Sequence, residues 1–197
     1  MRLILLSLVS ACTAFAGDIN LAAKIVTTLE EGASLKRVQF LSSDAAYAVS
    51  LDSGTDVERI GDGTRFSFQG LRSAVCELIP GPVPKKQPIV PEHYKTYQGA
   101  ALALAPAGAV MHDSPEITEQ PLQINNWKSY RVTFEFHMTD DPKKALSKMS
   151  VTFITLENGQ QAALITRARA TEFAGAHARA ESMIRSWYPV QNAVSVN

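Results

Sequence analysis

The sequence contains very little cysteine. Of its two cysteines, Cys12 lies in the N-terminal apolar segment, which leaves Cys76 as the one thiol in the rest of the chain. A single thiol excludes an intramolecular disulfide and a four-cysteine zinc site. The four histidines show no His-x-x-x-His or His-x-His spacing, and no Cys-x-x-Cys occurs. We therefore predict neither a metal site nor a cofactor.

The sequence also lacks an excess of charge of either sign. Nineteen Lys and Arg residues balance nineteen Asp and Glu residues among 197. Without a basic field, binding to nucleic acid is not expected. No apolar run approaches the ~20 residues that cross a bilayer as a helix, so no transmembrane span is predicted.

Familiar catalytic motifs are missing as well. There is no Gly-x-Ser-x-Gly, and Gly61-Asp62-Gly63 lacks the Lys-Ser/Thr of a phosphate-binding loop. Asp52, Asp56, Glu58 and Asp62 carry the oxygen ligands that calcium prefers, but their spacing departs from that of an EF-hand. We interpret this cluster as a solvated loop, and the chain as a protein that is not an enzyme.

The N-terminus has the pattern of an export signal. Arg2 precedes the short apolar run Leu3–Val9, and Ala14-Phe15-Ala16 predicts cleavage between Ala16 and Gly17. The run Val9–Cys12 also resembles a bacterial lipobox, which makes Cys12 an alternative lipidation site and lipid anchor. Both alternatives predict an exported protein, either periplasmic or secreted, or anchored to the envelope as a lipoprotein.

The rest of the chain indicates a single α+β domain over 17–190, followed by a frayed tail over 191–197. In the first half, we expect a helix over 18–31, strands over 38–41, 46–51, 64–69 and 73–79, and a loop over 52–64. Five prolines between Pro80 and Pro91 predict an extended surface loop, and Pro91 is well placed to begin a helix over 92–105.

The second half is more regular. Strands are predicted over 109–112, 122–124, 129–138, 149–156 and 161–168, with tight turns at Asn125-Asn126 and Asn158-Gly159. The alternation in 129–138 predicts one buried and one wet face. Thr171 is the expected cap of a closing helix that ends before Pro189. Together these elements predict a layered α/β/α sandwich with a central antiparallel meander sheet.

Residues 120–189 resemble the PsbP-like group, which includes the extrinsic photosystem subunit and the envelope lipoprotein DcrB. The similarity lies in two long hairpin strands, Met149–Leu156 and Gln161–Ala168, followed by a helix that closes on Ile184-Arg185-Ser186-Trp187. The resemblance implies an α/β/α sandwich and an accessory, non-catalytic role in an envelope or lumen. It carries over no ligand or metal residue.

Three function hypotheses follow from these observations. The first is an envelope protein that binds a partner protein through Trp127, Trp187 and Tyr188, because Trp and Tyr are enriched in binding hot spots. The second is a small-molecule carrier whose pocket between sheet and helices is lined by the aromatic residues Phe134, Phe136, Phe153 and Tyr94.

The third hypothesis is a hydrolase that uses Glu135 and His137, which share one face of the predicted strand 129–138. We expect Cys76 to be a small buried hydrophobe, because it has the strand parity of Ala74 and Leu78. His177 lies on the apolar stripe of the closing helix and is interpreted as a core-lining histidine.

Overall fold

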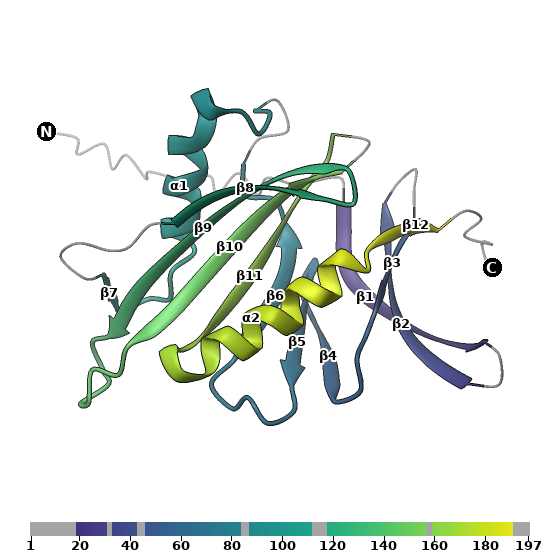
Figure 1. Cartoon of the computed structure of the whole chain (residues 1–197), viewed down its shortest axis with the longest axis horizontal. Coiled ribbons are helices and arrows are strands. Elements are labelled where there is room, and N and C mark those ends of the chain that lie inside the picture. Colours follow the sequence, from purple (N-terminus) through teal and green to yellow (C-terminus); the bar gives the residue numbers. More distant parts are fainter. Residues whose placement is uncertain are drawn as a thin grey trace, which may run out of the picture.

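The computed structural model describes residues 19–30, 33–42, 46–83, 87–111, 118–156 and 159–190, and the strands among them form two antiparallel sheets. The smaller sheet has four strands in the spatial order β1 (Ile19–Glu30), β2 (Ala33–Ser42), β3 (Ala46–Ser50) and β12 (Tyr188–Val190). The first and last segments of the described chain therefore belong to the same sheet (Figure 1). The predicted signal, Cys12 and the tail over 191–197 lie outside the described residues.

The larger sheet has eight strands. Its spatial order is β4 (Thr55–Ile60), β5 (Gly63–Phe68), β6 (Val75–Pro80), β11 (Gln161–Arg169), β10 (Ser147–Thr155), β9 (Trp127–Met138) and β7 (Ala109–Met111), with β8 (Thr118–Ile124) also paired to β9. Two three-stranded meanders, β4-β5-β6 and β9-β10-β11, are thus joined through the β6–β11 pair.

The helices cover opposite faces of the eight-stranded sheet. On one face, α2 (Ala170–Arg185) packs Phe173, Ala176 and Ile184 into a core that also contains the inner residues of the smaller sheet. On the other face, the 3-10 turn η1 (Pro91–His93) leads into α1 (Tyr94–Ala103), which buries Tyr97 and Ala101. The chain is therefore α+β, with an antiparallel sheet between two helical layers and a closing C-terminal helix, as predicted. The four-stranded sheet was not foreseen.

The predicted helix over 18–31 is wrong, because this segment forms strand β1. The apolar spacing of Ile19, Ala22, Val26 and Leu29 matches a helix, but the run Ile25–Thr28 consists of four β-branched residues. Such side chains lose χ1 freedom in a helix and pack well on a pleated surface. The antiparallel pairing with β2, which runs from Ile19 to Glu30 with one bulge, stabilises the segment as a strand and not as a helix.

The loop predicted over 52–64 is a second difference, since it contains strand β4. Val57 pairs with Phe66 and Glu58 with Arg65 across the β4–β5 hairpin. The loop composition is confined to the two turns, where Gly54 and Gly61 have φ values of +84° and +58°. Because β4 is a short edge strand with little apolar content, the Gly and Asp residues at the turns on either side made the whole segment look like a loop.

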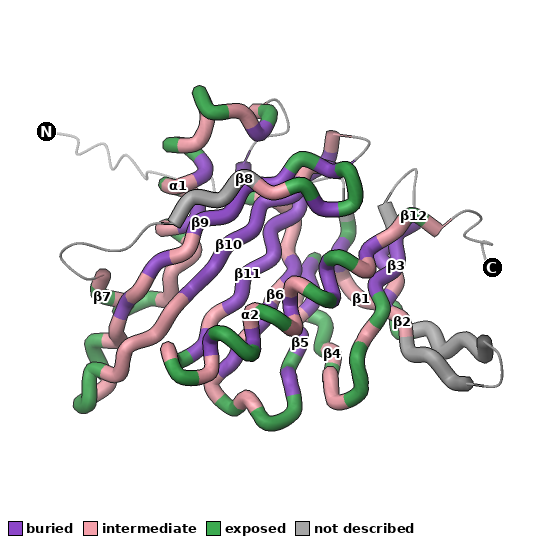
Figure 2. Tube along the Cα trace, in the orientation of Figure 1, coloured by how far each residue is buried: buried purple, intermediate pink, exposed green. Residues whose placement is uncertain are grey.

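The predicted wet face of β9 is present in part, because Thr133, Glu135 and His137 are half-buried and the residue before each of them is buried. Tyr130, Val132, Phe134 and Phe136 are buried against α1 as expected, but Arg131 on the other face is buried too. Burial of β9, β10 and β11 along most of their length is visible in Figure 2. Apolar-polar alternation cannot distinguish a solvated face from a polar face whose groups bond to a covering helix.

The hairpins of the C-terminal half are confirmed. Asn125 and Asn126 have φ values of +47° and +65° in the turn between β8 and β9. Strands β10 and β11 pair from Ser147–Arg169 to Thr155–Gln161. Helix α2 begins at Ala170 with no side-chain cap, so Thr171 is not the cap that the sequence suggested. The Pro-rich segment runs from the end of β6 to η1 without a helix or strand in its described part.

Candidate functional site

The two tryptophans expected to contact a partner lie in the interior. Trp127 is 4% exposed and Trp187 is 1% exposed. Their ring centroids are 5.5 Å apart in an edge-to-face arrangement, and each lies 5.9 Å from the ring of Tyr47. This aromatic cluster joins the start of β9, the end of α2 and strand β3. Tyr188 is the one member of the predicted trio that retains appreciable exposure.

Both indole N–H groups of this cluster are buried without a hydrogen-bond partner in the described part of the chain. An unpaired buried donor is costly, and its cost is tolerated here by the packing of large rings. The backbone carbonyl of Trp187 accepts a hydrogen bond from the Asn125 side chain. A direct partner contact through the indoles is therefore incompatible with this packing.

A buried polar group connects α2 to the sheet. Arg131 on β9 donates to Thr152 on β10 at 3.1 Å and forms an ion pair with Glu181 of α2. His177 Nε2 lies 3.9 Å from the same Glu181 carboxylate, and the His177 ring stacks on Phe173. Burial, together with the nearby Arg131 charge, lowers the pKa of His177, and Glu181 opposes this effect.

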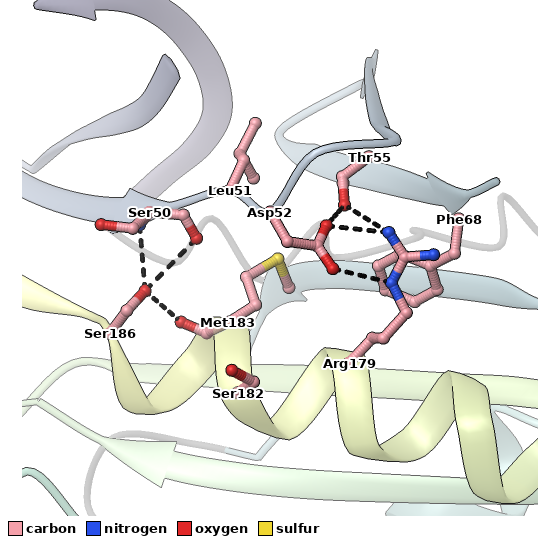
Figure 3. Close-up of a pocket in the computed structure, with 9 residues that line it drawn as sticks. All are labelled: Ser50, Leu51, Asp52, Thr55, Phe68, Arg179, Ser182, Met183 and Ser186. Carbon is pink, nitrogen blue, oxygen red and sulfur yellow. Dashed lines mark hydrogen bonds and ion pairs between the residues drawn. The ribbon is translucent and has the colours of Figure 1, made fainter. Parts of the chain in front are cut away.

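A second polar contact holds α2 against the β3–β4 connection (Figure 3). Arg179 forms two hydrogen bonds of 2.8 Å to the two oxygens of Asp52, and its guanidinium lies 4.7 Å from the ring centre of Phe68. The hydrogen bond from Arg179 outweighs partial burial and lowers the pKa of Asp52. A cavity of about 170 Å³ lies beside this pair, but the guanidinium and carboxylate are already bound to each other.

The thiol of Cys76 is fully buried, as expected. Burial raises its pKa to about 12. A thiol in this state is neutral near pH 7 and is a poor nucleophile. Cys76 therefore acts as a packing residue of the core between α2 and the sheet.

The carrier hypothesis placed a pocket at Phe134, Phe136, Phe153 and Tyr94. The three phenylalanines are fully packed in the core under α1, and Tyr94 stacks on Tyr130 with ring centroids 4.2 Å apart. These four residues therefore do not line one common pocket. Phe136, however, also borders a cavity of about 320 Å³ at the end of the sheet.

The hydrolase hypothesis rests on Glu135 and His137, which do share a face of β9. Glu135 forms an ion pair with Lys148, its cross-strand neighbour on β10. The Glu135 carboxylate is thus paired with a cation on the neighbouring strand.

The other titratable candidates have local structural contacts. Asp52 binds Arg179, Glu58 lies 3.5 Å from Arg65, and Asp141 accepts hydrogen bonds from the backbone of Lys143 and Ala145. His93 Nδ1 is 3.0 Å from the carbonyl of Pro88, and His112 lies outside the described residues. Among the residues that the structure describes, no three His, Cys, Asp or Glu side chains are placed to hold a metal ion.

Comparison with known proteins gives matches of structure alone. The fold is similar to that of cyanobacterial PsbP. That solution structure, from Synechocystis, has a TM-score of 0.42 and 9% sequence identity, and the match covers 92% of this chain and 99% of that one. A protein of unknown function from Pseudomonas aeruginosa, PA94, matches with a TM-score of 0.46 and 8% identity over 85% of this chain and 99% of that one. No family model and no curated protein matches the sequence.

Neither helix in the described part of the chain is long and apolar enough to cross a membrane.

The residues that connect α2 to the sheets were not singled out from the sequence. Arg131 was assigned to a wet face, and Glu181 and Arg179 have ordinary positions in an amphipathic helix. Their partners are 50 and 127 residues away along the chain. No local pattern could have identified pairs at such separations.

Proposed function

We propose that the chain is an exported, non-catalytic accessory protein of the cell envelope that binds a partner protein. The N-terminal pattern Leu3–Val9 and Ala14–Ala16 supports export. The internal pairing of Arg131, Glu181 and Arg179 supports a structural and not a reactive role for the buried charges.

The observation that carries partner binding is the outer edge of β1. The first part of this strand is anchored to the β4–β5 hairpin, because the Leu21 amide donates to the Asp62 carbonyl and the Ala23 amide donates to Thr64 Oγ1, each at 2.8 Å. Beyond a bulge between Asn20 and Lys24, β2 is the one strand among the described residues that pairs with β1 as far as Glu30. Figure 1 shows this part of the hairpin extending away from both helices.

An open strand edge of this length presents a row of backbone N–H and C=O groups. Such an edge can accept an extended segment of another protein as an additional strand. Ile25, which is 54% exposed, lies on this part of β1. We therefore infer that the partner contributes an extended segment that pairs with the region following Lys24.

The test is capture of a partner from the native envelope by the tagged mature protein. The informative variant is Ile25→Lys, which places a charge on the open edge without disturbing the core. Val110→Lys is the matched control, because Val110 is also an exposed large hydrophobic residue, at 38%, but lies on β7. Both variants are expected to keep the free energy of unfolding within about 0.5 kcal/mol of the wild-type value.

We expect crosslinking and mass spectrometry to recover one stoichiometric partner with the wild type and Val110→Lys, and at least tenfold less with Ile25→Lys. Equal recovery with all three proteins, or recovery of the bait alone, would contradict the proposal.

Export is tested by the intact mass of the mature protein. A chain that begins at Gly17 indicates cleavage after Ala16, and a lipid-modified Cys12 indicates the lipoprotein route. Retention of residues 1–16 without lipid would show that the chain is not processed for export.

A small-molecule carrier remains the second candidate function. The cavity of about 320 Å³ at the end of the eight-stranded sheet favours it, at a different place from the one the sequence suggested.

A further inference from the structure

We propose that the cavity at the end of the eight-stranded sheet binds a small organic anion, with Arg167 as the residue that holds its charged group. Its volume of about 320 Å³ is at the lower end of the roughly 300–1,000 Å³ of small-molecule sites. The site is separate from the open edge of β1, so it does not depend on the protein-binding function proposed above.

The strand register brings the polar lining of this cavity together. Ser147 at the start of β10 lies directly between Phe136 on β9 and Arg169 on β11. Arg167 is two residues before Arg169, opposite Met149. Directly opposed residues and residues two apart share a face, so all five side chains lie on the side of the sheet that α1 covers.

Helix α1 covers only part of this face. Its ring contacts are made by Tyr94 and Tyr97, which pack on Tyr130 and Phe153 at the other end of β9 and β10. Near the end of β9, the chain that follows α1 contributes Pro106 to the cavity wall. On this face of β11, Ala163 and Ile165 are apolar and lie under α1. The next two residues on the same face are Arg167 and Arg169, and they lie where the cover of α1 ends.

The two arginines of the cavity differ in their surroundings: hydrogen bonds from Ser73 and also the charge of Arg169 lower the pKa of Glu172, whereas the Arg167 side chain is paired with no carboxylate in the described part of the chain. In the described part of the protein, the backbone of Arg167 pairs with β10 and β6, but its guanidinium forms no hydrogen bond or ion pair. Arg169 lies two strand residues away on the same face, so the Cα atoms of the two residues are roughly 7 Å apart and a second cation stands near Arg167. Asp141 also lines the cavity, but its two oxygens accept the backbone N–H groups of Lys143 and Ala145 at 2.9 and 3.3 Å. An anion placed beside Arg167 would therefore meet a guanidinium that is not already paired within the described part of the chain.

The lining also indicates what the rest of the ligand is like. Phe136, Met138 and Pro106 provide apolar surface, and Ser147 provides a hydroxyl near the arginines. A planar guanidinium binds carboxylate or phosphate through two parallel hydrogen bonds. The combination fits a carboxylate or phosphate attached to a small apolar group better than it fits an inorganic ion.

The experiment is a titration of the folded protein with four probes, followed by NMR or calorimetry. Benzoate and phenyl phosphate carry both features, inorganic phosphate lacks the apolar part, and benzamide is a neutral analogue of benzoate. We expect saturable binding of benzoate or phenyl phosphate, at least tenfold tighter than that of benzamide and inorganic phosphate, with shifts at Phe136 and Ala168.

Arg167→Gln is expected to weaken this binding at least tenfold, and Arg167→Lys less, because it keeps the charge but loses the planar fork. Arg185→Gln is the matched control, since Arg185 is an exposed arginine of α2 outside the cavity. Unfolding temperatures of the variants establish that they are folded. Failure of both organic anions to bind, binding that Arg167→Gln leaves unchanged, or equal binding of benzamide would overturn the proposal.

Discussion

The thiol of Cys76 lies on β6 between Phe66 of β5 and Thr166 of β11, where burial raises its pKa to about 12. At pH 8 the thiolate fraction of such a group is on the order of 10⁻⁴. We expect iodoacetamide at pH 8 to label the folded protein at least ~100-fold more slowly than the protein unfolded in guanidinium. Cys76→Ala gives the background rate, and fast labelling of the folded chain would show that this thiol is accessible.

His177 makes the stability of the fold depend on pH. Its pKa in the folded protein lies below the ordinary value of 6.5, mainly because of burial and then because of Arg131. The unfolded chain therefore binds more protons at this residue. The free energy of unfolding decreases as the pH falls through 6.5 and continues to decrease until the pH reaches the lower pKa of the folded protein. Above 6.5 this contribution is fully present.

We expect the free energy of unfolding of the wild type to decrease between pH 7 and pH 5, and His177→Gln to show a smaller decrease over the same range. Chemical denaturation at several pH values measures both. The carboxylates Asp52 and Glu181, whose pKa values are lowered, lose their contribution only below about pH 4.5, which separates the two effects. Parallel profiles for wild type and variant would assign the pH dependence to other groups.

At the scale of single elements, the exit from β6 depends on Gly81. Its backbone N–H donates to the Gln161 carbonyl at 2.7 Å, and a Cβ atom here would lie 2.6 Å from Cβ of Gln161. Gly81→Ala should therefore destabilise the protein by about 1–3 kcal/mol, because β6 and β11 must move apart.

Gly99 of α1 provides the opposite case, since a Cβ atom at this position meets nothing within 4 Å. Gly99→Ala should stabilise the protein by about 0.5–1 kcal/mol, because alanine loses less backbone entropy in a helix. Thermal unfolding of the two variants side by side tests both signs. Destabilisation by Gly99→Ala would mean that α1 packs more tightly than the structure shows.

The elements also show where local sequence information is sufficient. Asn125-Asn126 predicted its turn because two consecutive positive φ values require such residues, and the alternation of Tyr130, Val132 and Phe134 predicted β9. The N-terminal segment was mistaken for a helix because a spacing of three or four apolar residues also occurs by chance in a strand. Its identity depends on β2, a partner that no local window contains.

The same limit applies to the candidate sites. Burial of Cys76 followed from strand parity, which is local information. Burial of Trp127 and Trp187 depends on Tyr47 and Phe40 of the four-stranded sheet, which the sequence analysis did not foresee. The cavity beside Arg167 arises where α1 ends short of the sheet, and that is a property of packing and not of any motif.

At the scale of the whole molecule, the aromatic cluster connects the two sheets and α2. Trp187 is in contact with Phe40, Tyr47 and Trp127, with ring centroids 5.5–5.9 Å apart. Its removal therefore leaves a cavity where three elements meet. We expect Trp187→Ala to cost roughly 3–5 kcal/mol and Trp187→Phe clearly less.

The same cluster predicts a single unfolding transition. Tryptophan fluorescence reports on the junction and far-ultraviolet circular dichroism on all strands, so the two denaturation curves of the wild type should coincide. Separate midpoints would show that the two sheets unfold independently.

The place of β12 in the smaller sheet has a consequence for how the chain acquires its structure. Strand β3 can pair with β12 only after Tyr188–Val190 has been synthesised, and β6 can pair with β11 only after Gln161–Arg169 has been synthesised. Until then, the nascent chain carries unpaired strand edges, which are prone to aggregate. The order of synthesis therefore places both long-range pairs late, and the two sheets close only after β11 and β12 are available to pair with strands of the N-terminal half.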